Sequence, residues 1–411
     1  MENLTKSDLK ILRSIQLLDL PTRQSISIDV NLSLLKVSKV LKFLEDLGSI
    51  RKAGKSFSAS GRPSYIYELN PAYLYSLGAS ISNVGMTIVV INATKKIIRS
   101  EKILFTDKAL QSDDVNLLIN QIIEPLKSIQ NDLKDQGKSL SSIGISVPGM
   151  IDTAKHIWLS GLQLPGIDHV DINKEICKRM EIPVYAEDNS RIISYGEKVL
   201  GQGKNIKNFV VLYLGIGVGA GIVINNEIYR GTHGTAGEIG HVISANNNYR
   251  CSCGNVGCLE TVTSHSGILR IFRDRLSEGV HSPLQIYNQK EGGLTFESIL
   301  KAADNDDKLA RDTLFEIGQF IGDACTILIN LFNPEKLIIT GSVAIFEKYL
   351  SEAIKLSLSR KILPNILEQT VITFTPYSST NEAHYAALFA ISQYWDDLIT
   401  NNLDFTDLKC K

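Results

Sequence analysis

Three cysteines and one histidine lie close together in the sequence, and their types and spacing are those of a metal site. Cys251, Cys253 and Cys258 form a glycine-rich C-x-C-x4-C loop, and His241 lies ten residues upstream. Three thiolates and one imidazole make a closed tetrahedral Cys3His set, which is the pattern of structural zinc. Thiolates favour Zn²⁺ over Mg²⁺ or Ca²⁺, and four protein ligands leave no position for a catalytic water. The alternatives are free buried thiols or a redox pair.

The N-terminus and the other cysteines bear on the compartment. The first residues lack a basic-then-apolar signal pattern, and no stretch reads as long and apolar enough to span a membrane. We therefore expect a cytoplasmic protein without a membrane partner. Cys177, Cys325 and Cys410 are scattered. In a cytosolic chain, a tight cysteine cluster indicates metal binding rather than disulfides.

Charge is distributed unevenly along the 411 residues, although the net charge is only −1. Residues 1–69 hold eleven Lys/Arg and seven Asp/Glu, a net charge of +4, and the remainder carries −5. This asymmetry fits a DNA-binding head on an acidic body, and a solvated basic face would look the same.

The apolar periodicity of the head predicts three helices. One follows from residue 9 and stops before Pro21, a short second one spans residues 22–28, and a third runs over residues 33–47. The third has an apolar stripe that we expect to pack on the first two, made of Leu34, Val37, Val40, Leu41 and Leu44. Its polar face is free to enter a major groove. The candidate DNA contacts on it are Ser33, Lys36, Ser38, Lys39 and Lys42.

A period-two pattern after Gly48 predicts two short strands around a basic loop. Within that loop, Gly61-Arg62-Pro63 would form a rigid hook whose Arg62 enters a minor groove. Three helices followed by a basic wing predict a winged helix-turn-helix DNA-binding domain over residues 1–70. The alternative is a small helical bundle used for dimerisation.

The rest of the chain alternates apolar strands and helices, which predicts an α/β body. A meander of three strands over residues 77–104 precedes a helix from residue 115 and a strand over 142–147, and a second meander starts at residue 209. This repetition predicts two similar lobes: a small lobe over residues 71–190, to which a C-terminal helix over 380–400 returns, and a large lobe over 191–380 that carries the zinc site.

Four segments together make the chain similar to a known family. GISVPG at 144–149, GTAGEIGH at 234–241, CSCGNVGCLE at 251–260 and NPEKLIITG at 333–341 resemble the ROK family of bacterial repressors, uncharacterised reading frames and sugar kinases. The head, with its Gly-Arg-Pro wing, resembles the family's transcriptional-repressor branch. The resemblance implies the two-lobed, actin-like and hexokinase-like (ribonuclease H-like) ATPase fold.

The resemblance also implies a sugar site. Glu238 and Glu260 fall where family members contact the sugar ring, and His241 faces the sugar in the family, so these three are the first-choice ligands. A surface carboxylate or a helix cap is the other interpretation, above all for Glu260. Family kinases carry an Asn and a Trp where this chain reads QLPGI at 163–167. Gln163 can still hydrogen-bond a hydroxyl, but Ile167 offers no aromatic surface.

Compared with the family's kinases, this chain lacks two features that phosphoryl transfer needs, the general base and the phosphate loop. The family's general base is the Asp of a Glu-Asn-Asp run, and Asn189, which cannot accept the proton, falls on that position; Asp188 is adjacent. The family's Asp-x-Gly-Gly-Thr phosphate loop is replaced by Ser80-Ile81-Ser82-Asn83-Val84. The later glycine segment at 215–221 is intact.

These observations predict a sugar-responsive repressor of a carbohydrate-use operon. Its partners would be operator DNA and a sugar or sugar phosphate, and it would act as a homodimer or homotetramer. Asp188 and Asn189 would line the sugar site without catalysing. One alternative is an ATP-dependent sugar kinase that keeps a DNA-binding head and uses Asp188 as base. A scaffold whose body binds another protein is a third.

Overall fold

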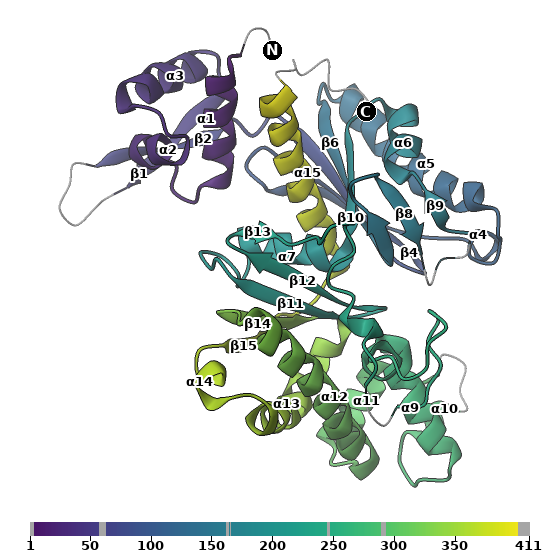
Figure 1. The fold of residues 1–411 in the computed structure, drawn as a ribbon. Helices are drawn as coiled ribbons and strands as arrows, with labels where there is room; N and C mark the ends of the chain where they lie inside the picture. The colour runs from purple at the N-terminus through teal and green to yellow at the C-terminus, as the bar shows by residue number, and fades with distance from the viewer. Residues whose placement is uncertain are drawn as a thin grey trace. The chain divides into compact units, whose positions relative to one another are not determined.

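The computed structural model describes residues 4–56, 63–161, 164, 166–244, 247–288 and 293–401. Its internal contacts divide the chain into two units (Figure 1). The first comprises Met1–Val147, Lys155–Glu187 and Ser379–Lys411, and the second comprises Pro148–Ala154 and Asp188–Ser378. Each unit is built around one five-stranded sheet.

The N-terminal head contains the three expected helices, α1 (Lys6–Leu17), α2 (Arg23–Asp29) and α3 (Leu34–Asp46). Each begins after a hydroxyl residue, Thr5, Thr22 or Ser33, whose side chain accepts a hydrogen bond from the first turn. A hairpin of β1 (Ile50–Ser56) and β2 (Ser64–Leu69) follows. Arg62 and the rest of the predicted hook up to residue 62 lie outside the described residues.

One residue of the predicted apolar stripe, Leu34, is not buried in the core of the head. Val37, Leu41 and Leu44 of α3 are buried, but Leu34 is 45% exposed. Leu34 is the first residue of α3 and lies at its exposed N-terminal end, where Ser33 and Leu35 are exposed as well.

The sheet of the first unit has the strand order β10-β6-β3-β4-β5. Strands β3 (Tyr75–Ile81), β4 (Gly85–Asn92) and β5 (Ile97–Leu104) form the predicted antiparallel meander, and β6 (Leu140–Val147) lies parallel to β3. The edge strand is β10 (Val184–Asp188). The unit also contains α4 (Asp107–Leu110), α5 (Val115–Asp135), α6 (Ile172–Met180) and the antiparallel pair β8 (Ile157–Ser160) and β9 (Asp168–Val170).

The C-terminal helix α15 (Ser379–Asn401) packs on β3, β4 and β6 of this sheet (Figure 1). Glycines in the two central strands allow the close approach. A Cβ on Gly78 would lie 2.0 Å from the carbonyl oxygen of Ala383, and one on Gly144 would lie 1.9 Å from that of Ala386. The helix also contacts α1, so the first and last helices of the described chain meet in one unit.

The second unit repeats the strand order of the first. Its sheet runs β13-β12-β11-β14-β15: β11 (Phe209–Leu214), β12 (Val218–Ile224) and β13 (Glu227–Ile228) form a meander, and β14 (Lys336–Thr340) and β15 (Val371–Phe374) add in parallel. The strand predicted up to Arg230 ends at Ile228, because only two of its residues pair with β12. Strand β7 (Met150–Asp152) also belongs to this unit.

Helices complete the second unit: α7 (Asn189–Val199), α8 (Glu260–Thr263), α9 (His265–Ser277), α10 (Gln285–Asn288), α11 (Phe296–Asp304), α12 (Lys308–Phe332), α13 (Glu347–Lys361) and α14 (Pro364–Leu367). Contrary to the expectation from the sequence, α12 is long and apolar enough to cross a membrane. However, 56% of its most apolar window is buried, and it packs against α13 in the large core of this unit. A core helix meets the same length and composition criteria.

Candidate functional site

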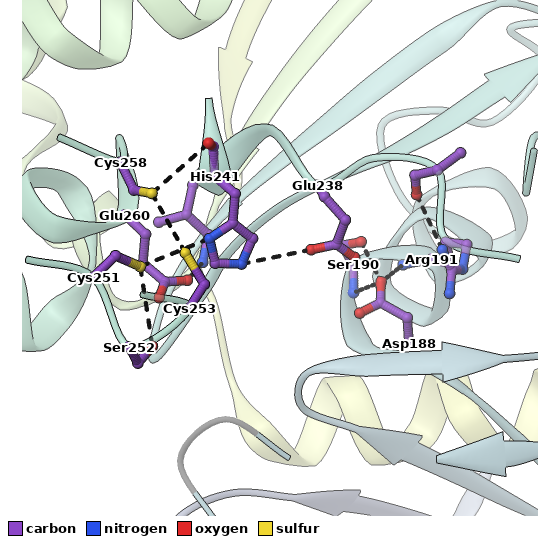
Figure 2. A network of polar contacts seen from close by, with 12 residues as sticks. Asp188, Ser190, Arg191, Glu238, His241, Cys251, Ser252, Cys253, Cys258 and Glu260 are labelled. Carbon is purple, nitrogen blue, oxygen red and sulfur yellow. Dashed lines mark hydrogen bonds and ion pairs between the residues drawn. The ribbon is translucent and has the colours of Figure 1, made fainter. Parts of the chain in front are cut away.

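The four predicted metal ligands converge. The ligand atoms of His241, Cys251, Cys253 and Cys258 all lie within 4.8 Å of one another. The Cys253 and Cys258 sulfurs are 3.7 Å apart, as are the Cys251 sulfur and the His241 Nδ1 atom (Figure 2). A tetrahedral metal with metal–sulfur distances of about 2.3 Å requires neighbouring sulfurs roughly 3.8 Å apart. The cluster therefore has the donor atoms and the dimensions to hold a metal ion.

The cysteine loop is held from one side by Asn247, a residue that the sequence alone did not single out. Its side-chain amide donates to the Cys258 carbonyl at 2.9 Å and to the Thr261 hydroxyl at 2.7 Å. Asn247 is buried. Its amide therefore ties the last cysteine to helix α8, and a polar residue before a cysteine loop is the signal that would have found it.

His241 links the cysteines to an acidic group. Its Nδ1 faces Cys251, and its Nε2 lies 4.0 Å from the Glu238 Oε2 (Figure 2). One ring nitrogen therefore faces a cysteine sulfur, and the other faces a carboxyl group. This is the arrangement in which a metal at Nδ1 leaves Nε2 available to a polar partner.

The backbone before Glu238 fixes its position. Gly237 has φ +103°, and a Cβ there would lie 2.0 Å from the carbonyl oxygen of Ala220, so only glycine fits. The Gly237 carbonyl accepts a hydrogen bond from the Ala220 N–H at 2.8 Å, which ties the turn to β12. Burial, followed by the neighbouring Asp188 carboxylate, raises the pKa of Glu238 to about 8. At neutral pH this carboxyl can both donate and accept.

Asp188 and Asn189 stand at the start of α7. Oδ1 of Asp188 accepts from the backbone N–H of Ser190 at 3.0 Å and from that of Arg191 at 3.2 Å, as well as from the Ser190 hydroxyl (Figure 2). The carboxylate is thus the N-cap of α7. Asn189 is the first residue of the helix and is half-buried.

Arg191 is a second residue that the sequence alone did not single out. Its side chain is 1% exposed, and its guanidinium donates to the carbonyl of Ala236 at 3.1 Å. It also opposes the rise in the pKa of Glu238. A buried cation that reaches the backbone just before Glu238 holds that carboxyl near α7, so that Glu238 lies between the Cys/His cluster and the Asp188 group (Figure 2).

Glu260 is the first residue of α8, but it does not cap the helix: the N-cap is Leu259, and no side chain caps this helix. Its Oε2 accepts from the Val218 backbone N–H at 3.0 Å, which ties the cysteine loop to the glycine segment before β12. Burial raises the pKa of Glu260, and the Val218 hydrogen bond and the nearby His241 oppose that rise. Glu260 therefore has a structural partner as well as a position beside the cluster.

The remaining predicted positions lie elsewhere. Gln163 is outside the described residues, and Ile167 is buried. In the β3–β4 turn, the Ser82 hydroxyl donates to the Gly85 carbonyl at 2.9 Å and accepts from the Val84 N–H at 3.4 Å. That N–H is directed at the turn's own side chain rather than outward, where a phosphate would need it.

Five of the six predicted DNA contacts of the head lie on α3 or at its N-cap, and Arg62 lies outside the described residues. Lys36, Lys39 and Lys42 are exposed. The Ser33 hydroxyl caps α3 through the Lys36 N–H at 3.3 Å, and the Ser38 hydroxyl donates to the Leu34 carbonyl at 2.7 Å. The lysines are therefore the free polar groups of this face, and the two serines are already engaged.

Two sheets of identical strand order define the fold as the actin-like, hexokinase-like type. The chain belongs to the ROK family, whose family model matches residues 81–392.

Among curated relatives, the DNA-binding transcriptional dual regulator NagC of Escherichia coli K12 is 26% identical over 80% of this chain and 78% of its own. The xylose repressor of Caldicellulosiruptor bescii is 27% identical over 81% and 82%. The glucokinase of Halalkalibacterium halodurans is 34% identical over 56% of this chain and 69% of its own.

A solved ROK family transcriptional regulator, described as a homolog of the E. coli MLC protein, matches 98% of this chain and 100% of its own with a TM-score of 0.79 and 25% identity. A ROK family glucokinase from Streptomyces griseus matches 77% of this chain and 99% of its own, with a TM-score of 0.65 and 22% identity.

Proposed function

We propose that this protein is a sugar-responsive, DNA-binding transcriptional repressor. The observation that supports the proposal most strongly is the share of the chain that each solved structure matches. The likeness to the solved transcriptional regulator extends over 98% of the chain, whereas the likeness to the solved glucokinase covers 77% of it. The relatives named as repressors or regulators match about four fifths of the chain.

In this proposal, residues 1–70 are a winged helix-turn-helix domain, and residues 71–190 and 191–380 are the two lobes of the body. Helix α3 enters a major groove with its exposed lysines toward the DNA, and the β1–β2 hairpin is the wing. Two heads of a homodimer or homotetramer read a pseudo-palindromic operator. The protein acts in the cytoplasm, where the operator and the sugar are found.

The effector site is the group around Glu238. Glu238, His241 and Glu260 bind sugar hydroxyls, and Asp188, Asn189 and Gln163 complete the site. His241, Cys251, Cys253 and Cys258 hold a structural Zn²⁺, which when bound fixes the ring of His241 and keeps its Nε2 facing Glu238. The sugar changes the affinity for operator DNA only by as much as it favours one conformation of the protein over the other.

We infer further that kinase activity is lost. Asn189 stands at the position of the family's general base, and an amide cannot take up a proton. The Val84 N–H donates to the Ser82 hydroxyl of the same turn, so this group offers little to a phosphate.

Fluorescence anisotropy tests the proposal. The purified zinc-loaded protein is titrated onto labelled DNA from upstream of its own gene, with competitor DNA and a panel of sugars. We expect tight, salt-sensitive binding that one sugar weakens. Absence of specific binding with every sugar would overturn the repressor function.

A sugar kinase that keeps a DNA-binding head is the second candidate, favoured by the 34% identity to the H. halodurans glucokinase. It requires Asp188 to act as base, whereas the Oδ1 of this carboxylate already accepts three hydrogen bonds at the start of α7. A coupled ADP-release assay with the same sugar panel separates the two functions: the repressor releases no ADP above background. A scaffold body without sugar affinity would give neither response.

A further inference from the structure

Leu35 is an apolar residue on the outward face of α3. Helical geometry at 100° per residue places Leu35, Lys39 and Lys42 on one side, opposite the buried Val37 and Leu41. The Leu35 side chain is 69% exposed, and both lysines are exposed. One leucine therefore begins a stripe that continues with Lys39 and Lys42, before Asp46 at the end of the helix.

The position of Leu35 in α3 is equally specific. Ser33 caps the helix, so Leu35 lies in its first turn. In helix-turn-helix proteins, the N-terminal residues of the second helix of the motif reach the edges of the bases, while the first helix crosses the backbone. A charged or polar side chain would be well solvated at this place, whereas leucine gains nothing from water.

The chemistry around Leu35 selects the partner. An apolar protein surface would have to bury the ammonium groups of Lys39 and Lys42, which is costly. A DNA major groove offers phosphates to the lysines and one apolar group on the base edges, the 5-methyl of thymine. The stripe is complementary to that combination.

We propose that Leu35 is a specificity-determining residue that packs against the methyl group of a thymine at a fixed position in each half-site of the operator. This inference rests on the proposed DNA-binding function and adds the base that the head reads. The lysines supply affinity without regard to sequence, and Leu35 supplies discrimination.

The test begins with in vitro selection of a binding site from a random library by the full-length protein. Each thymine of the selected site is then replaced by uracil, which removes only the methyl group. We expect one position per half-site at which uracil weakens wild-type binding about fourfold, the equivalent of one buried methyl group. The Leu35→Ala variant should bind the thymine site more weakly and show no further loss with uracil at that position.

Leu104→Ala is the matched control, because Leu104 is a 79% exposed leucine on β5, outside the head. It should retain wild-type affinity and wild-type sensitivity to uracil. Equal affinity of the wild type for thymine and uracil at every position, or an unchanged uracil effect in Leu35→Ala, would overturn the role of Leu35 while leaving DNA binding intact. Failure to enrich any sequence would overturn the DNA-binding function itself, and this inference with it.

Discussion

The indole N–H of Trp395 on α15 donates a hydrogen bond to the side-chain oxygen of Gln16 on α1, although 379 positions separate the two residues. Trp395 is fully buried, and Gln16 is 5% exposed. The Gln16 amide nitrogen reaches the carbonyl of Ala93 at 3.5 Å, and an Arg13–Asp396 ion pair of 2.9 Å flanks the contact. The first helix of the head is thus tied to the C-terminal helix by a buried polar contact.

Replacement of Trp395 by Phe should leave the buried oxygen of Gln16 without its donor. We expect the free energy of unfolding to fall by about 1–3 kcal/mol, the cost of an unsatisfied buried polar group together with lost packing. Urea denaturation followed by circular dichroism measures the change. The Gln16→Met, Trp395→Phe double variant should lose less than the sum of the two single changes, because neither partner is then left unpaired. Additive losses would contradict this account of the contact.

Features that depend on residues close together in the sequence can be predicted from residue types and spacing. The cysteine loop and His241 were predicted from residue types alone, because metal ligands need a fixed set of donors within a short span. The capped helices of the head and the strands of both meanders also follow from local pattern. These features depend on near neighbours in the chain.

Features that depend on contacts between residues far apart in the sequence could not be predicted from local patterns. The burial of α12, for example, depends on its packing against α13 in the core of the second unit. Arg191 lies in no recognisable motif, since its guanidinium acts through the carbonyl of Ala236, 45 positions away in the sequence. The coupling of Gln16 to Trp395 is of the same kind.

Removal of one thiol should empty the metal centre. We expect the purified wild type to contain about one zinc ion per chain and Cys258→Ser to contain little, because a closed four-ligand site loses most of its affinity with one ligand. Elemental analysis measures the content, and a thermal melt of each protein reports the loss of stability. Cys325→Ala is the matched control, since Cys325 is a buried free thiol of α12 outside the cluster. A metal-free wild type that is equally stable with chelator would contradict the structural role of zinc.

Glu197 should make the second unit less stable as pH rises. The carboxylate is 1% exposed, and its Oε2 accepts from the Gln202 N–H at 2.7 Å. Burial raises its pKa above the ordinary 4.5, although that hydrogen bond and Lys336 oppose the rise. Its stabilising contribution is therefore full below about pH 4.5, the value expected in the unfolded chain, and is lost as pH rises through the raised folded-state value.

Glu197→Gln keeps an acceptor for Gln202 and removes the titration. Its stability relative to the wild type should increase between acid and neutral pH, as measured by urea midpoints across that range. Glu352→Gln, at an exposed position of α13, controls for the loss of one negative charge. A pH-independent difference between wild type and Glu197→Gln would show that burial does not shift this carboxyl.

Replacement of Glu238 should weaken the release of DNA by the sugar without changing the affinity for DNA itself. We expect Glu238→Gln to bind DNA as the wild type does and to need about fivefold more sugar for release. The amide nitrogen cannot accept a hydrogen bond as a carboxyl oxygen can, and a hydrogen bond between neutral groups contributes about 1 kcal/mol. Anisotropy competition measures both quantities in one titration. Glu227→Gln, an exposed carboxylate of β13, should leave the sugar response unchanged. Equal effector concentrations for the three proteins would remove Glu238 from the site.

Lys39 should act on DNA affinity through phosphate rather than through base identity. It is exposed on the face of α3 that also carries Leu35 and Lys42. Each phosphate contact releases about one counterion, so Lys39→Ala should lower the slope of log affinity against log salt by about one. The loss should be similar on selected and on random DNA, which distinguishes this residue from Leu35. Lys102→Ala on β5, also exposed but outside the head, should keep the wild-type slope. If Lys39→Ala kept that slope too, α3 would not face the phosphates, and the proposed docking of the head would be wrong even with DNA binding retained.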